Sequence, residues 1–211
     1  DFGQACLILF GWSVMYFVSG APMLLIGGIV LSLIPATQLA YNSSEHFARR
    51  IDGFLDRTLD PTTQIGYATA AIREGGLFGV GVGEGQVKWS LPDAHTDFII
   101  SVAAEEYGLV LVGVILMLYA IIVLRSYFRL MRERDPFIRL AGTGLVAIFG
   151  VQALVNMGVA VRLLPSNGMT LPFVSYGGSS LIAGGIAVGM ILAFTRTRPQ
   201  GEISDILRGH S

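Results

Sequence analysis

The chain has 211 residues, of which only 14% are charged, and its mean hydropathy is +0.64. Ordinary soluble domains carry about 25% charged residues, so this composition, with its long apolar runs, indicates an integral membrane protein. The formal net charge of −1 gives no electrostatic case for binding nucleic acid, and the single cysteine, Cys6, excludes an internal disulfide or a cysteine-based metal cluster.

Five apolar segments are long enough to cross a membrane, which takes about 20 residues of helix. The sequence therefore predicts an all-α, polytopic membrane helix bundle with spans at about 2–20, 23–41, 97–125, 137–161 and 179–195. Pro35 interrupts the second span and is expected to kink it. The chain shows neither an initiating methionine nor a signal-peptide layout, so we expect it to be the C-terminal part of a longer protein.

Basic residues in short loops predict the orientation of these spans. Arginines flank the link after the third span and follow the fifth span, so both segments are expected to be cytoplasmic (Arg125, Arg129, Arg132, Arg134 and Arg139; Arg196, Arg198 and Arg208). Because spans alternate, the loops at about 42–96 and 162–178 are then outside and the tail at 199–211 is cytoplasmic. The 42–96 loop also carries arginines, but long loops translocate largely regardless of charge.

The 42–96 loop carries patterns that predict two short helices. Apolar residues recur at helical spacing from Phe47 to Leu59, and Thr62 or Thr63 can cap a second helix that closes at 75–76. A structured loop above a membrane bundle is typical of a lid or a binding surface. The glycines that follow lack the G-x-G-x-x-G spacing, which favours a flexible loop over a phosphate cradle (Gly79, Gly81, Gly83 and Gly85).

Asp97 stands where this loop meets the third span. It can cap that helix, or act as a base whose charged form is disfavoured by apolar neighbours, or do both. Lys88 and His95 are close enough in the sequence to hold or counter its charge. His95 has no second histidine near it in the chain, which argues against a histidine metal site.

Glu105 and Glu106 lie about two turns into the third span, where carboxylates are costly unless they are paired or hydrated. Two interpretations stay open. Glu105 shares roughly the face of Asp97, which indicates a polar cleft that enters the membrane from outside. Alternatively, the span begins near Tyr107 and both glutamates lie at the interface.

The second outer loop, 162–178, is apolar enough to dip back into the bundle, yet it carries hydroxyl groups that include those of Ser175 and Tyr176. A re-entrant loop is tolerated only where protein or a wet cavity satisfies its backbone. This loop therefore also indicates a cavity open to the outside. Asn156, deep in the fourth span, is expected to hydrogen-bond a neighbouring helix.

Three stretches of the chain resemble the SEDS family of shape, elongation, division and sporulation proteins. They are the run 79–83 with Lys88 and the LPDAHTDFI segment at 91–99, the segment 156–180 with its GMTLP and SYGGSS motifs, and the opening Asp1-Phe2-Gly3. The resemblance covers about residues 1–198, and Lys88 with the Pro92-Asp93-Ala94 form is closer to the division members than to the elongation members. The chain departs from the family pattern at Ile100, where Phe is common, and at Ser166-Asn167, where Thr-Lys is common.

The resemblance implies a membrane glycosyltransferase with about ten spans, of which those found here are the last five. It implies an enzyme that polymerises lipid II into glycan strands on the outer face of the bacterial inner membrane, during cell division or cell-shape maintenance. The implied partners are a class B penicillin-binding protein and other proteins of the division or elongation complex. Asp97, in the His-Thr-Asp-Phe motif, would be the catalytic residue.

On this interpretation Asp97 takes the proton of a sugar hydroxyl that attacks the anomeric carbon of another lipid II and inverts it. The lipid pyrophosphate would leave with help from Lys88, Arg49, Arg50 or Arg73, or from Mg²⁺ or another divalent cation. The lipid tail stays in the bilayer while the headgroup enters the cleft. The expected substrate-binding residues are Lys88, His95, Thr96, Glu105, Arg49, Arg50, Ser175 and Tyr176.

Two other functions fit part of the pattern. A flippase or transporter for a lipid-linked precursor needs the same cleft but no base at its outer edge, and Pro35 and Glu105 are features of the kind that such a protein uses. A non-catalytic scaffold that recruits a penicillin-binding protein predicts that Asp97→Ala leaves function intact.

Overall fold

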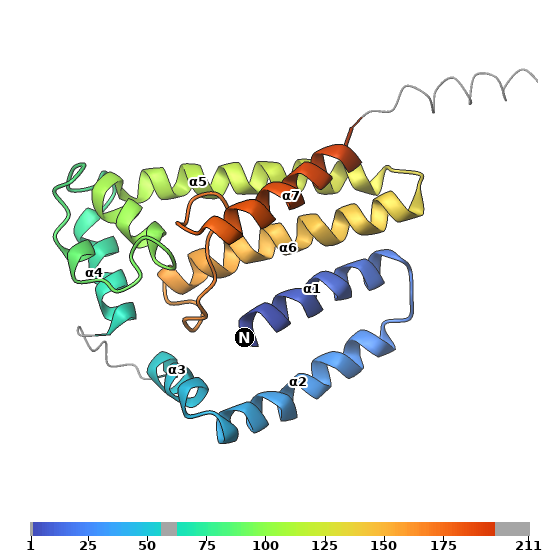
Figure 1. Ribbon diagram of the computed structural model, residues 1–211, viewed down its shortest axis with the longest axis horizontal. Coiled ribbons are helices and arrows are strands. Elements are labelled where there is room, and N and C mark those ends of the chain that lie inside the picture. The colour runs from blue at the N-terminus through green and yellow to red at the C-terminus, as the bar shows by residue number, and fades with distance from the viewer. Residues whose placement is uncertain (1, 56–62, 197–211) are drawn as a thin grey trace, which may run out of the picture.

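The computed structural model describes residues 2–55 and 63–196, except for the side chains of Phe2 and His46, so the expected tail at 199–211 lies outside the described residues. Within them the chain forms helices and no strand, which confirms the all-α class (Figure 1). The elements are α1 (Phe2–Val18), α2 (Leu24–Ser43), α3 (Glu45–Leu55), α4 (Gln64–Gly75), the 3₁₀ helix η1 (Val87–Trp89), α5 (Ile99–Met131), α6 (Pro136–Ala160) and α7 (Gly178–Phe194).

Three of these helices are long and apolar enough to cross a membrane: α2 with 20 residues, α5 with 33 and α6 with 25. Helices α1 and α7 are also apolar but have 17 residues each, which is about the shortest length that spans a bilayer. The helix α2 does not end at Pro35 but continues through it to Ser43. These lengths and compositions describe a multi-pass membrane protein.

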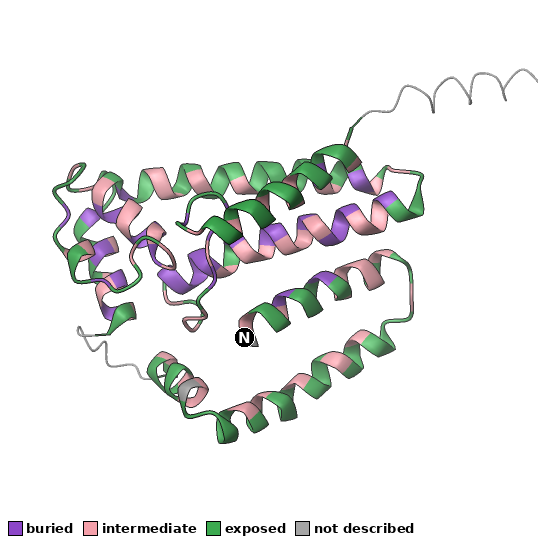
Figure 2. Ribbon diagram, viewed as in Figure 1, coloured by how far each residue is buried: buried purple, intermediate pink, exposed green. Residues whose placement is uncertain are grey.

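Helix α6 lies at the centre of the bundle and packs against α1, α5 and α7 (Figure 1). Buried positions follow one another along α6, whereas α2 has none (Figure 2). Glycine allows the close contacts of α6, because a Cβ at Gly142 would lie 2.5 Å from Leu130 and a Cβ at Gly144 would lie 2.6 Å from Met15. Small residues at helix contacts are the usual means of close packing between membrane helices.

The loops gather at the two ends of the bundle in the order that alternating spans require (Figure 1). The end of α2, helices α3 and α4, and the loop between α6 and α7 lie at one end. The turn between α1 and α2, the link between α5 and α6 and the end of α7 lie at the other. The two loops that were expected to be outside therefore share one end of the molecule.

Helix α5 differs from the expected third span, because it is broken at Gly108, where φ is 81° and ψ is 175°. The loop that follows α4 supplies the backbone partners that this break leaves without a helical bond. The N–H groups of Val80 and Gly81 donate to the carbonyls of Glu105 and Glu106 at 2.9 and 3.1 Å. On the far side of the break, the N–H groups of Leu109 and Val110 donate to the carbonyls of residues 76 and 77 at 3.0 and 3.2 Å.

The structure corrects two expectations about this region. The glycine-rich loop is not a flexible connector, since its backbone lies against that of α5 and a Cβ at Gly79 would collide with the Glu106 carbonyl. Asp97 is not the N-cap of α5, because Phe98 occupies that position and no side chain caps the helix. The cap expected at α4 is confirmed: the Thr63 hydroxyl accepts the Gly66 N–H at 3.1 Å, and the helix ends at Gly75.

Candidate active site

Two segments that are far apart in the sequence, 91–98 and 168–177, are bonded together at the loop end of the bundle. The Ser175 hydroxyl donates to the Thr96 carbonyl at 2.5 Å and accepts the Leu171 N–H at 2.8 Å. The Tyr176 N–H donates to the His95 carbonyl at 2.9 Å, and the two rings meet edge to face with 5.8 Å between their centroids. His95, Thr96, Ser175 and Tyr176, four of the expected site residues, therefore lie side by side.

Asn156, buried in α6, holds the same two segments. Its Nδ2 donates to the Asp97 carbonyl at 3.0 Å and to the Met169 carbonyl at 2.6 Å. One turn earlier, the Gln152 Nε2 donates to the Thr170 carbonyl at 3.1 Å. The expectation that Asn156 bonds a neighbouring helix is wrong. Its amide satisfies loop carbonyls instead, which is what a loop that dips into a bundle requires.

The Asp97 carboxylate lies beside Gly168, with Oδ2 3.8 Å from the point where a Cβ at Gly168 would stand. Partial burial is the main cause that raises the pKa of Asp97 above its ordinary value. The negative charge of Asp93 raises that pKa further, while the positive charge of Arg50 acts in the opposite direction. A carboxyl with a raised pKa is better matched to proton transfer near neutral pH than an ordinary aspartate.

A cavity of about 790 Å³ lies between α1, α2, α3, α6 and the segment 164–169. Its walls on α1 and α6 are mostly apolar, and its polar lining includes Arg50, Ser166 and Asn167. Gly168 is part of the lining, and the Asp97 carboxylate, which is not itself on the lining, lies next to the cavity on the far side of Gly168. The volume falls within the range of about 300–1,000 Å³ that is typical of ligand sites.

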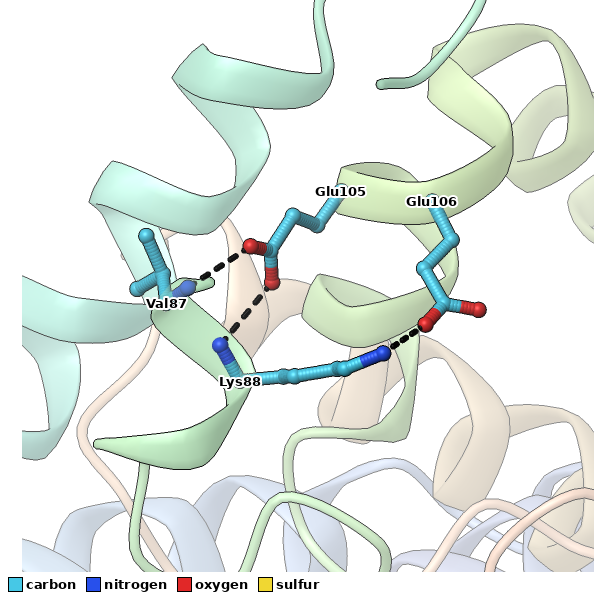
Figure 3. A network of polar contacts seen from close by, with 4 residues as sticks. All are labelled: Val87, Lys88, Glu105 and Glu106. Atoms are coloured by element: carbon cyan, nitrogen blue, oxygen red, sulfur yellow. Dashed lines mark hydrogen bonds and ion pairs between the residues drawn. The ribbon is translucent and has the colours of Figure 1, made fainter. Parts of the chain in front are cut away.

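Glu105 and Lys88 form a separate network with η1 (Figure 3). Glu105 is fully buried, and its carboxylate accepts the N–H groups of Val87 at 2.8 Å and Lys88 at 3.0 Å. The Lys88 ammonium is ion-paired with Glu106, and both side chains are only 14% exposed.

The cavity lining includes neither Glu105 nor Lys88, which lie in the network with η1 instead, so their contact with substrate stays a prediction. The reason is that a buried carboxylate requires hydrogen-bond donors, and the first N–H groups of η1 supply them. Of the two interpretations of the glutamates, the polar cleft does not hold for Glu105, whose carboxylate faces the folded loop, whereas a span that begins near Tyr107 fits the break in α5 at Gly108.

The expected cations are also separated by the fold. Arg49 is exposed and pairs with Glu45 at 3.5 Å, one turn earlier on α3, whereas its neighbour Arg50 lines the cavity. Successive residues on a helix point in different directions, so only one of the two can face the cavity. Arg73 is exposed in the last turn of α4. Of the four described cations expected at the site, Arg50 alone reaches the cavity lining.

The comparisons with known proteins agree with the sequence motifs. The model of the FtsW, RodA and SpoVE family, described as "Cell cycle protein", matches residues 1–200. The chain belongs to this family. The resemblance to the SEDS proteins is thereby confirmed, and the chain spans about half the length of the curated relatives that it matches.

Two curated relatives of this chain are both named FtsW. A probable peptidoglycan glycosyltransferase FtsW from Caulobacter vibrioides is 44% identical over 202 residues, which cover 94% of this chain and 51% of the relative. A protein of the same name from Geobacter metallireducens is 43% identical over 192 residues, covering 89% of this chain and 51% of the relative.

Two solved structures share the fold of this family member. One belongs to a study of how a peptidoglycan synthase complex coordinates polymerization and crosslinking; it has a TM-score of 0.68 and 34% identity and covers 91% of this chain and 55% of its own. The other is the rod-shape-determining protein RodA of Thermus thermophilus in an aspartate-to-alanine variant. It has a TM-score of 0.57 and 30% identity and covers 94% of this chain and 51% of its own.

Asp93, Asn156 and Gly168 were not among the predicted site residues of this family member, although the motifs that carry the family resemblance contain all three. Asp93 has a φ of 56° and Gly168 a φ of 69°, so both shape turns in the segments that carry the site. The signals that could have found them are the Pro92-Asp93 turn and the polar side chain of Asn156 in an apolar helix. The composition of the cavity wall could not have been predicted, because it comes from α1, α2, α3 and α6 together.

Proposed function

We propose that the full-length protein is a peptidoglycan glycosyltransferase that polymerises lipid II into glycan strands. The observation that carries the proposal is the Asp97 carboxyl, which two bonded loops hold next to a large apolar cavity with Arg50 on its wall. The names of the relatives, probable peptidoglycan glycosyltransferases, support the same reaction.

In the proposed reaction, a sugar hydroxyl of one lipid II attacks the anomeric carbon of a second. Asp97 accepts the hydroxyl proton as the new carbon–oxygen bond forms. The bond between that carbon and the pyrophosphate oxygen breaks, so the lipid pyrophosphate leaves with the bonding electrons and the centre inverts. A positioned base of this kind typically contributes about 10²–10⁴-fold to the rate.

Arg50 is the proposed partner of the leaving pyrophosphate. Its guanidinium carries a permanent charge and a fork of N–H donors that suits phosphate oxygens. It lines the cavity and acts electrostatically on Asp97, so both groups belong to one site. The apolar walls on α1 and α6 suit the part of a lipid-linked substrate that lies next to its pyrophosphate.

The remaining site residues divide into two groups. The exposed side chains of His95 and Tyr176 are the proposed sugar contacts, because they stand next to Asp97 and their rings touch each other. Thr96 and Ser175 are bonded to each other through the Thr96 carbonyl, so we assign them to holding the two loops in register.

A divalent cation such as Mg²⁺ was expected to help the leaving group. No group of three or more His, Cys, Asp or Glu residues that could hold a metal ion occurs in the described parts of the chain. The donors in these parts therefore do not form a protein cage for the ion.

We further propose a location and partners. The arginines between α5 and α6 and after α7 favour a cytoplasmic C-terminus in the bacterial inner membrane, with Asp97 at the outer face. The structural likeness to a protein of a peptidoglycan synthase complex supports association with a class B penicillin-binding protein. The FtsW names of the relatives favour the division complex over the elongation complex.

The test is lipid II polymerisation by the purified full-length protein with its penicillin-binding protein, whose own crosslinking activity is blocked by a β-lactam. Glycan strands resolved by gel electrophoresis are the expected product. If no strands form but the protein moves lipid II between the leaflets of vesicles, it is a flippase. If strands form equally with Asp97→Ala, Asp97 is not the base, and either the base lies elsewhere in this protein or the protein is a non-catalytic scaffold.

A further inference from the structure

Asp93 closes the turn that leads to Asp97. Its backbone is left-handed, with φ at 56°. Its carbonyl accepts the N–H groups of Thr96 at 3.1 Å, Asp97 at 3.1 Å and Phe98 at 3.3 Å, and also the Thr96 hydroxyl at 3.2 Å. A left-handed residue other than glycine is costly unless it is Asn or Asp, so the residue type at position 93 fits the geometry of the turn.

The charges that act on the Asp97 carboxyl come from two elements. Asp93, on the same turn, raises its pKa, and Arg50 on α3 lowers it. The segment 168–177 carries no charged residue, and its titratable group is the Tyr176 phenol beside the neighbouring His95. Helix α6 presents the neutral amide of Asn156 to the Asp97 carbonyl. One negative and one positive side chain therefore act on Asp97 in opposite directions.

We infer that Asp93 is a positioning residue for Asp97. Its backbone closes the turn that presents the Asp97 carboxyl, and its own carboxylate supplies the neighbouring negative charge. The inference rests on the proposed function, because it gives Asp93 a part in the same site. Asp93 acts through Asp97 and touches no reacting atom.

Two variants separate the backbone role from the charge. Asp93→Asn removes the charge but tolerates a left-handed backbone, whereas Asp93→Ala removes the charge and strains the turn. With the full-length protein and its partner, the acidic limb of the pH–rate profile is expected to move to lower pH in both variants. The maximal rate stays near native for Asp93→Asn and falls roughly 5- to 30-fold for Asp93→Ala, since the strained turn is populated less.

A second readout does not depend on activity. The Tm of the full-length protein is measured against pH for the native chain, Asp93→Asn, Asp97→Asn and the double variant. Asp97→Asn is expected to change the pH dependence of Tm less in the Asp93→Asn background, because Asp97 then titrates closer to its ordinary range.

An unmoved acidic limb together with equal effects of Asp97→Asn in both backgrounds overturns the inference and leaves the proposed function standing. If the native protein makes no glycan at all, the proposed function fails instead. The Tm cycle then decides the inference by itself, with coupling between positions 93 and 97 supporting it and additivity refuting it.

Discussion

The Asp97 carboxyl is held in surroundings that disfavour its charged form. Burial and the neighbouring Asp93 raise its pKa, so the folded protein binds this proton more tightly than the unfolded chain does. Stability from this group is therefore fully present below the unfolded pKa and is lost as the pH rises through the folded pKa. A base next to an apolar cavity is useful for proton transfer but unfavourable for folding.

Asp97→Asn is accordingly expected to raise the Tm of the full-length protein at neutral pH while it lowers the rate of polymerisation about 10²–10⁴-fold. The gain should shrink at low pH, where the native carboxyl is already protonated. Thermal unfolding followed from about pH 3, below the ordinary aspartate pKa of about 3.9, to about pH 8 checks this. An equal Tm difference at every pH would contradict a raised pKa.

The Glu105 carboxylate, which was expected to bind substrate, accepts hydrogen bonds from the backbone of η1. Glu105→Ala should leave the partly buried N–H groups of Val87 and Lys88 without their acceptor, at a cost of up to about 1–3 kcal/mol for each group. The expected result is a lower Tm and a lower yield of folded protein, measured by thermal unfolding in detergent. The control is Glu84→Ala, at an exposed position on the same loop. Similar losses in both variants would refute the role given to the Glu105 carboxylate.

At the scale of the elements, the break in α5 and the glycine-rich loop are one structure. The break at Gly108 frees backbone groups on both of its sides, and the loop after α4 pairs with them. The same region holds the Glu105 carboxylate and η1, so the first two turns of α5 are fixed in place next to Asp97. Glycine is required where the two backbones touch, because a Cβ at Gly79 would collide with the Glu106 carbonyl.

Two glycines of this loop form a matched pair for testing this contact. Gly79 and Gly83 have nearly the same φ, 80° and 85°, but a Cβ at Gly83 would meet nothing within 4 Å. Gly83→Ala should cost about 1–2 kcal/mol from backbone strain alone. Gly79→Ala adds the collision and should prevent folding or lower Tm much further. Equal Tm values for the two variants would contradict the backbone contact.

The sequence predicted the helices well because each has its own local signal. The Thr63 cap and the end of α4 at Gly75 follow from residue types next to the helix. The contact between the glycine-rich loop and α5 could not be predicted, because alternating glycines are equally compatible with a free loop and with a loop whose backbone lies against another segment. Asp97 could be found from its position before an apolar run, while the partners of Glu105 lie 17 and 18 residues away on a loop.

At the scale of the whole molecule, the segments 91–98 and 168–177 lie at one end of a bundle built around α6 (Figure 1). The segment 164–169 at this end also lines the cavity. The Asn156 side chain links the two loops to α6, and the cavity wall on α1 and α6 continues from them into the bundle. A lipid-linked substrate could therefore place its reacting group at the loops while its apolar part stays among the helices.

Cys6 lines this cavity and offers a way to fill it. Cys6→Trp should reduce kcat/KM for lipid II about tenfold or more, which corresponds to a loss of about 1.4 kcal/mol. The Tm should change little, because the added ring occupies empty space. Cys6→Ala is the control and should keep native activity. Full activity of the Trp variant would mean that the substrate does not use the cavity.

The most direct test of the central claim is the rate of lipid II polymerisation by the full-length protein with its partner, native against Asp97→Asn. Asp135→Asn makes the same chemical change at the cap of α6, at the other end of the bundle. If Asp97 is the base, its variant loses about 10²–10⁴-fold in rate while remaining folded and bound to its partner, and Asp135→Asn stays close to native. A near-native rate for Asp97→Asn would show that the base lies elsewhere.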